Sequence, residues 1–164
     1  MAIILKKGEE TVLVNDKGMP VLNLTVGANW GKINRLGSAP KAGFIDRLIG
    51  NVAKVTGQLE DVDLDLSLLF FNGSKEFVEK CYFGNKTLFG GAVSHTGDDL
   101  TGDDEVDEAD NERIKFKGAV IPMTVQTVFV VLNSYRHQNF GEIPFVGFSI
   151  YDGLYGLGDK APRL

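Results

Sequence analysis

The stretch Asp61-Val62-Asp63-Leu64-Asp65-Leu66-Ser67-Leu68 alternates polar and aliphatic side chains without a break. Because successive side chains of a β-strand point to opposite faces, this alternation predicts a strand whose aliphatic residues enter the core. The three aspartates then share the other face, about 7 Å apart along the strand. Like charges in such a row repel one another. Two interpretations are possible, a solvated strand face and a cation that bridges the aspartates to another loop. We favour the bridging cation.

Further strands surround this one along the chain. Asn72-Gly73 predicts a hairpin turn into a return strand over 76–83. Short runs rich in β-branched and aromatic residues predict the other strands. These runs are Ile3–Leu5, Thr11–Val14, Met19–Ala28, Ile114–Phe116, Thr124–Leu132 and Pro144–Tyr151. About eight short strands in 164 residues indicate an all-β fold, a β-sandwich, in one domain over residues 1–164.

Residues 31–57 break the strand pattern. The stretch is basic and loop-like at first, and then Phe44, Leu48, Val52 and Val55 recur at three- and four-residue spacing. This period predicts about three turns of amphipathic helix. We expect the helix to pack on a sheet edge, with partner docking or a membrane surface as the alternative.

A second concentration of acids occupies residues 97–112, which contain nine Asp and Glu and no Lys or Arg. The net charge is −5, so the rest of the chain carries +4. Ca²⁺ takes six to eight oxygen ligands, and a loop with Gly97 and Gly102 can turn both carboxylates and carbonyls inward. The spacing is not that of an EF-hand. The negative charge also argues against a nucleic-acid partner.

Other chemistries have little basis in the sequence. Cys81 is the single cysteine, so we expect a buried thiol, no internal disulfide and a cytoplasmic protein. His95 and His137 lie far apart, without zinc spacing, and no apolar run is long enough for a membrane span. Two alternatives to a calcium-binding protein stay open. They are a divalent-cation-dependent hydrolase that uses the clustered aspartates and an interaction domain without metal.

Several motifs together resemble the TerD family of tellurium-resistance and bacterial stress proteins. They follow the family order along nearly the whole chain. They are Leu5-Lys6-Lys7-Gly8-Glu9, the Asp61–Ser67 strand, Phe83-Gly84-Asn85-Lys86-Thr87, Val93-Ser94-His95-Thr96-Gly97-Asp98-Asp99-Leu100-Thr101-Gly102, Asp110-Asn111-Glu112-Arg113-Ile114 and Gln138-Asn139-Phe140-Gly141.

The resemblance implies a β-sandwich that binds Ca²⁺ through the Asp-x-Asp-x-Asp strand and the His-x-Gly-Asp loop. It also implies a cytoplasmic stress-response role, exercised through protein partners of a resistance system rather than through catalysis. Together with the residue pattern it gives eight candidate metal ligands. These are Asp61, Asp63, Asp65, Asp98, Asp99, Asp103, Asp110 and Glu112.

The sequence departs from the family pattern in three places. Residues 31–57 resemble an insertion, and the acidic loop is longer than usual. The chain ends at Leu164, about where the family continues into a final strand. We therefore expect an open sheet edge, at which self-association is favoured because an unpaired edge is a template for another strand.

Overall fold

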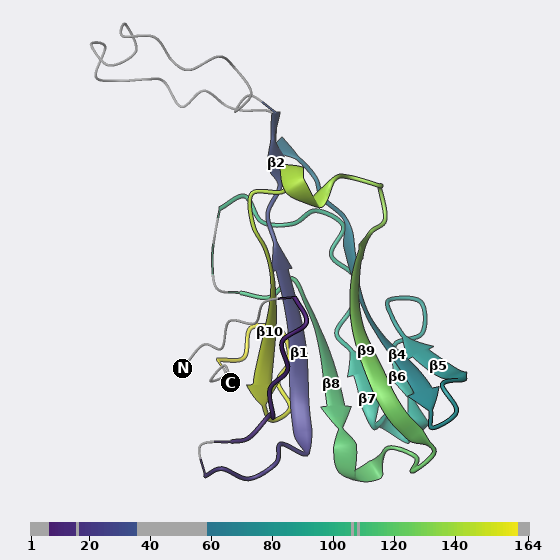
Figure 1. Cartoon of the computed structure of the whole chain (residues 1–164). Helices are drawn as coiled ribbons and strands as arrows, with labels where there is room; N and C mark the ends of the chain where they lie inside the picture. The colour runs from purple at the N-terminus through teal and green to yellow at the C-terminus, as the bar shows by residue number, and fades with distance from the viewer. Residues whose placement is uncertain (1–6, 16, 36–58, 106, 108, 161–164) are drawn as a thin grey trace, which may run out of the picture.

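The computed structural model describes residues 7–15, 17–35, 59–105, 107 and 109–160 (Figure 1). Over these residues the fold is almost entirely β-strand and loop, which confirms the all-β prediction. The helices within the described ranges are three short 3₁₀ turns, η3 (Phe89–Gly91), η4 (Gly118–Val120) and η5 (Phe140–Glu142). The strands are β1 (Asn23–Trp30), β2 (Ile33–Asn34), β3 (Leu59–Glu60), β4 (Leu64–Asn72), β5 (Phe77–Cys81), β6 (Thr87–Leu88), β7 (Val93–His95), β8 (Glu112–Lys117), β9 (Val125–Ser134) and β10 (Val146–Asp152).

The strands form three antiparallel sheets. A five-stranded sheet has the order β10-β1-β8-β7-β6, a three-stranded sheet has the order β5-β4-β9, and β2 pairs with β3. In Figure 1, β1 and β10 lie on one side of the molecule and β9, β4 and β5 on the other. The two larger sheets bury one common core. Its members are Val26, Ala28, Trp30, Ile33, Val62, Leu64, Leu66, Leu68, Phe70, Cys81, Leu88, Val93, Ile114 and Ile143.

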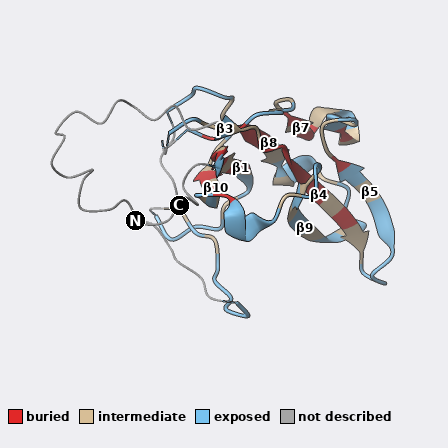
Figure 2. Cartoon of the chain, turned by 90° about the horizontal axis from the view of Figure 1, so that it is seen from above, coloured by how far each residue is buried: buried red, intermediate tan, exposed pale blue. Residues whose placement is uncertain are grey.

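Strand β4 crosses the centre of this core. Its aliphatic residues Leu64, Leu66 and Leu68 are at most 1% exposed, as the alternation predicts, and the burial of Cys81 is confirmed as well. Figure 2 shows the buried stretch of β4. The opposite face at the start of this strand is also covered, because Asp63 and Asp65 are only 3% and 5% exposed. The chain at the start of β4 thus buries aliphatic side chains on one face and carboxylates on the other.

Most of the predicted strands correspond to observed ones. The return strand over 76–83 is β5, and the three strands predicted near the C-terminus are β8, β9 and β10. The backbone bond from Lys75 N to Asn72 O, 3.0 Å, closes the predicted hairpin turn. The predicted strand Met19–Ala28 is shifted, since β1 begins at Asn23 and ends at Trp30. Sequence alternation therefore located the strands well and their ends less well.

One predicted strand is absent, and two observed strands were not predicted. Thr11–Val14 is not a strand, because its only ladder contact in the described structure is the isolated bridge between Val14 and Pro20. No strand was predicted in the glycine-rich stretch 84–97, which contains β6 and β7. These short strands have no local periodicity of their own. Pairing of β7 with β8, for example Val93 with Phe116, positions them.

Some predictions fall on residues outside the described ranges. These are the strand Ile3–Leu5 and the amphipathic helix through Phe44 and Val55. Among the described residues, no helix has both the length and the apolar character needed to span a membrane.

Candidate metal centre

Three of the predicted ligands meet at the start of β4. Asp63 and Asp65 project from the same face of that chain segment, and Asp98 reaches them from the loop after β7. One carboxylate oxygen from each residue lies within 4.8 Å of the other two. The three carboxylates line a cavity of about 160 Å³. The remaining lining residues are Phe83, Leu100 and Tyr135.

Asp63 is the least exposed of the three, and one of its carboxylate oxygens lacks a donor. Its Oδ1 is buried without a hydrogen-bond partner among the described residues, and the Nε of Arg136 lies 3.6 Å from its Oδ2. Burial raises the pKa of the Asp63 carboxyl, and the negative charge of Asp98 raises it further. A buried carboxylate oxygen without a donor is costly unless a cation approaches it.

Asp65 is held by one amide. Its Oδ2 accepts a 2.9 Å hydrogen bond from Asn133 Nδ2 on β9. Burial raises the pKa of Asp65 to about 6, against the lowering effect of the Asn133 bond. The charges of Asp63, Glu112 and Asp98 raise this pKa further. The site therefore resists carrying three negative charges without a counter-ion.

The donor set fits a hard cation. Oxygens that bind one Ca²⁺ at about 2.4 Å lie at most about 5 Å apart, and the three carboxylates meet that condition. The group contains only carboxylates, without imidazole or thiolate, which favours calcium or magnesium over zinc. The orphaned Oδ1 of Asp63 is the atom that such an ion would satisfy.

Asp99, the neighbour of Asp98, has a different environment. Its Oδ1 accepts hydrogen bonds from Thr101 N, Thr101 Oγ1 and Gly102 N, and its Oδ2 accepts one from Asn111 Nδ2. Burial raises the pKa of Asp99, but the bonds from Asn111, Thr101 and Gly102 outweigh it and hold the pKa below its usual value. The protein itself stabilises this carboxylate in its charged form.

Asn111 connects the acidic loop to the core. Its Nδ2 donates to both Asp99 Oδ2 and Asp103 Oδ1, and its Oδ1 accepts from Trp30 N at 2.8 Å. Trp30 is fully buried and donates its indole N–H to Val62 O. Asp103 keeps one buried oxygen, Oδ2, without a partner in the described structure.

Asp110 is part of a buried ion pair. Its Oδ2 accepts from Arg113 Nε at 2.7 Å and from Tyr151 Oη at 2.6 Å, and its side chain is fully buried. Its Oδ1 has no hydrogen-bond partner among the described residues. The carboxylate occupies the space over Gly27 of β1, where an added Cβ would lie 2.2 Å from Oδ2. A glycine inside a central strand therefore makes room for this pair.

The last two candidates also have protein partners. Glu112 is fully buried, and its two oxygens accept from Leu66 N at 2.9 Å and Asp99 N at 3.1 Å. Asp61 is partly exposed and pairs with Lys32 Nζ at 3.3 Å. The structure thus brings together Asp63, Asp65 and Asp98, and it places the other five candidates in separate contacts.

Several residues around the carboxylates were not predicted from the sequence. Arg136, Tyr135 and Asn133 come from the end of β9 and the turn after it, about seventy positions from Asp65 in the chain. One signal was available, because Asn133 is a polar residue that follows an uninterrupted apolar run at 128–132. Its pairing with Asp65 in the β4–β9 register brings the amide to the carboxylate.

Comparison with known proteins identifies relatives. The TerD domain family matches residues 1–155. The chain is 34% identical over 150 residues to stress response protein SCP2 of Bacillus subtilis, covering 87% of this chain and 67% of that protein. It is 24% identical over 134 residues to tellurium resistance protein TerZ of Serratia marcescens (82% and 61%), and 27% identical over 152 residues to TerD of the same organism (87% and 65%). The matched region thus spans about two thirds or less of each relative.

Solved structures agree on the fold. A crystal structure of a homologue of the telluride resistance protein TerD from Streptomyces coelicolor superimposes with a TM-score of 0.56 at 13% identity, covering 81% of this chain and 67% of that one. A second crystal structure, of a protein of unknown function, gives a TM-score of 0.56 at 13% identity over 88% and 78%. The TerD family matches residues 1–155, and a relative is 34% identical over 87% of this chain, so the chain belongs to the TerD family.

Proposed function

We propose that this chain is a calcium-binding stress-response module in which Asp63, Asp65 and Asp98 hold the ion. The observation that carries the proposal is the convergence of three carboxylates within 4.8 Å around a cavity, with one buried oxygen lacking a donor. A divalent cation removes the repulsion among these groups and satisfies that oxygen. Backbone carbonyls and water complete the six to eight ligands that Ca²⁺ requires.

This ligand set is narrower than the eight candidates from the sequence. Asp99 and Glu112 already accept hydrogen bonds from backbone amides, and Asp110 is neutralised by Arg113. A carboxylate that already has hydrogen-bond donors must lose them to bind a metal ion, which costs free energy. A carboxylate with few donors binds the ion without that cost. We assign these residues to holding the acidic loop in place, so that Asp98 is positioned over the start of β4.

We infer the biological role from the relatives of this chain. SCP2 of Bacillus subtilis is named a stress response protein, and TerZ and TerD of Serratia marcescens are named tellurium resistance proteins. We propose a role of the same kind for this chain, in the cytoplasm and through protein partners, on a β-sandwich formed by the two larger sheets. These names give no support to the alternative of a cation-dependent hydrolase. A module that acts by binding needs only a metal-ordered surface.

Titration calorimetry with two matched variants tests the assignment. Asp98→Asn removes one proposed ligand, whereas Asp104→Asn removes the same charge from the same loop at a side chain that is 68% exposed and paired with Lys32. We expect Asp98→Asn to weaken Ca²⁺ binding at least about tenfold, equivalent to about 1.4 kcal/mol, and Asp104→Asn to leave it near the wild-type value. Equal losses in both variants would indicate general electrostatic attraction and would overturn the assignment. Mg²⁺, which demands octahedral geometry, should bind more weakly than Ca²⁺.

A further inference from the structure

Strand β9 is a long and unprotected sheet edge. It has ten residues, lies at the end of the order β5-β4-β9, and pairs on its outer side with no strand in the described part of the chain. None of its residues is buried, and Figure 2 shows it in the colours of intermediate and exposed residues. Its sequence, Val125 to Ser134, contains no charged residue, proline or glycine. Charged residues, proline and glycine on an edge strand normally block edge-to-edge pairing, and β9 has none of them.

The other sheet edges carry such features. Strand β6 is only two residues long, and β5 is five residues long and contains Glu79 and Lys80. Strand β10 contains Gly147 and ends at Asp152. Only β9, among the described edge strands, combines length with a neutral sequence of high β-propensity. Nothing in the sequence of β9 therefore opposes pairing with a further strand.

The register defines which backbone groups face outward. Tyr135 N donates to Asp63 O at 2.9 Å, one position beyond the pair formed by Leu64 and Ser134. In an antiparallel ladder, hydrogen-bonded and non-hydrogen-bonded pairs alternate. Odd-numbered residues of this part of β9 therefore bond to β4, and even-numbered residues direct their N–H and C=O groups to the outer side. Val128 and Val130 thus present backbone donors and acceptors at the edge.

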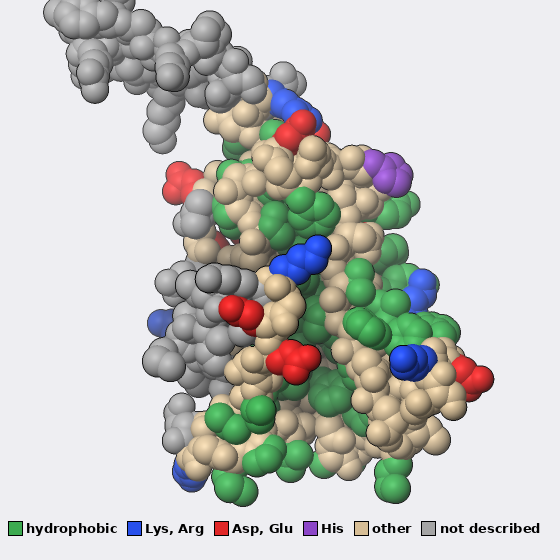
Figure 3. All heavy atoms as spheres, viewed as in Figure 1, with side chains coloured by type: hydrophobic (Ala, Val, Ile, Leu, Met, Phe, Trp, Pro, Cys, Tyr) green, Lys and Arg blue, Asp and Glu red, His purple; other side chains and the backbone are tan. Residues whose placement is uncertain are grey.

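Apolar surface flanks this edge on both faces. Val128 and Val130 line an apolar cavity of about 190 Å³ between the sheets, together with Val26 and Ile150. On the outer face, Phe129 is 54% exposed. In Figure 3, hydrophobic side chains gather where β9 and β5 lie in Figure 1.

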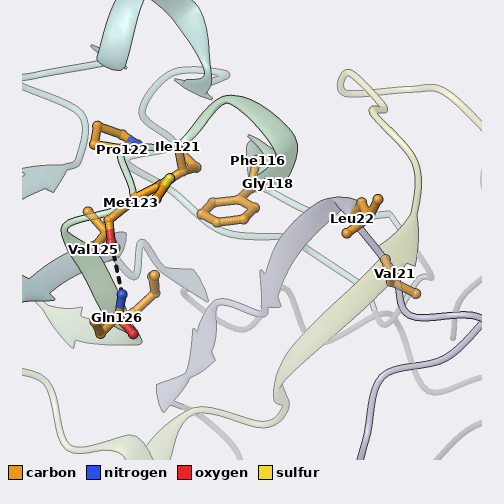
Figure 4. A pocket seen from close by; sticks show the side chains of 10 residues that line it. Val21, Leu22, Phe116, Gly118, Ile121, Pro122, Met123, Val125 and Gln126 are labelled. Atoms are coloured by element: carbon orange, nitrogen blue, oxygen red, sulfur yellow. Dashed lines mark hydrogen bonds between the residues drawn. The ribbon is translucent and has the colours of Figure 1, made fainter. Parts of the chain in front are cut away.

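A second apolar cavity, of about 510 Å³, lies at the beginning of β9 (Figure 4). Val125, Gln126 and Val128 of the strand line it together with Phe116 and Ile121. The acidic cavity lies at the other end of the β4–β9 pair, since Asn72 pairs with Val125 and Leu64 with Ser134. An occupant of the edge would therefore not need to displace the metal ligands.

We propose that β9 is a dimer interface, at which it pairs antiparallel with β9 of a second copy and joins two three-stranded sheets into one of six strands. The strand is complementary to itself. With Phe129 on the two-fold axis, its ring meets Phe129 of the second copy, Val128 pairs with Val130, and Thr127 pairs with Val131. Apolar and aromatic cross-strand pairs of this kind stabilise a sheet, and no like charges oppose each other. The inference is independent of the calcium proposal.

Sedimentation equilibrium of the full chain, with EDTA and with Ca²⁺, tests the dimer through a matched pair of variants. Phe129 and Phe77 are 54% and 55% exposed, and both rings contact Phe71 edge to face. Phe77, however, lies on β5 at the opposite edge of the sheet. Phe129→Lys brings two ammonium groups together at the axis, so we expect dimer affinity to fall at least about tenfold. Phe77→Lys should leave it unchanged.

Three results would overturn the proposal. They are a wild-type chain that stays monomeric up to high micromolar concentration, equal losses in the two lysine variants, and a dimer that survives Phe129→Lys in a variant whose folding is verified by circular dichroism.

Oxidative cross-linking tests the same pairing without a charge change. In a Cys81→Ser background, Phe129→Cys places two thiols across the two-fold axis at a non-hydrogen-bonded pair. The Cα separation at such pairs is about 4.5 Å, within the range of a disulfide. We expect a disulfide-linked dimer in high yield from Phe129→Cys and little from Phe77→Cys in the same background. Equal yields from the two positions would contradict pairing through β9.

Discussion

Two groups of acidic side chains meet at the neighbouring residues Asp98 and Asp99, and their surroundings differ. Asp99, Asp110 and Glu112 accept hydrogen bonds from backbone amides, an arginine and a tyrosine. Asp63, Asp65 and Asp98 lie close together with few donors. The number of acids in a segment therefore does not by itself identify a metal site. The number of donors that the protein already supplies to each carboxylate separates the proposed ligands from the structural residues.

The largest expected effect lies in the first group. Asp110→Asn removes the charge that neutralises Arg113, which is only 4% exposed, while nearly preserving side-chain volume. Breaking a buried pair in this way costs about 3–5 kcal/mol. We expect urea unfolding in EDTA to show this loss, and Ca²⁺ affinity to be retained where the variant folds. A stable variant that no longer binds Ca²⁺ would move Asp110 into the ligand group.

Calcium itself should have the next largest effect. A ligand that binds only the folded state at one hundred times its Kd stabilises that state by about 2.7 kcal/mol. For a chain of this size, the melting temperature should rise by roughly 5–10 °C, and EDTA should reverse the rise. Asp65→Asn should remove most of this response. A full calcium response in that variant would mean that the ion binds elsewhere.

The stability of the calcium-free protein should depend on pH through Asp65. Burial raises the pKa of Asp65 in the folded state to about 6, whereas an aspartate in the unfolded chain has a pKa of about 3.9. Between these values the folded state holds a proton that the unfolded state has released, so stability falls as pH rises from about 4 to about 6. Asp99 has the opposite sign, because its lowered pKa favours the folded state as pH rises. Urea unfolding in EDTA should therefore show a smaller loss over this range for Asp65→Asn than for the wild type. Parallel curves would contradict the raised pKa of Asp65.

The smallest effect is expected at Asp61. This carboxylate was a candidate ligand from the strand pattern, yet it is 44% exposed and pairs with Lys32. Exposed ion pairs contribute about 0–1 kcal/mol, so Asp61→Asn should change stability little. We also expect an unchanged Ca²⁺ affinity in calorimetry. A loss of Ca²⁺ affinity as large as that of Asp65→Asn would mean that Asp61 is also a ligand.

The sequence predicted what depends on local periodicity. The alternation at 61–68 located β4, its core face and two of the three proposed ligands, and the loop motif supplied Asp98. The sequence could not show which of the eight acids are proposed ligands and which are structural. The donors to these carboxylates are set by loop geometry or come from residues remote in the chain, as Tyr151 does for Asp110 and Asn133 for Asp65. For the same reason it missed β6 and β7, which depend on pairing with β8 rather than on their own pattern.

A crystal structure of the protein grown with Ca²⁺ would show directly which carboxylates bind the ion. We predict an ion at about 2.3–2.6 Å from carboxylate oxygens of Asp63, Asp65 and Asp98, with the bonds from Arg113 to Asp110 and from Leu66 N to Glu112 retained. An anomalous difference map places the ion independently of the refined coordinates. A calcium ion bound by Asp99, Asp110 or Glu112 instead would contradict the proposed site. The same holds if Asp63, Asp65 and Asp98 stay without an ion at saturating Ca²⁺.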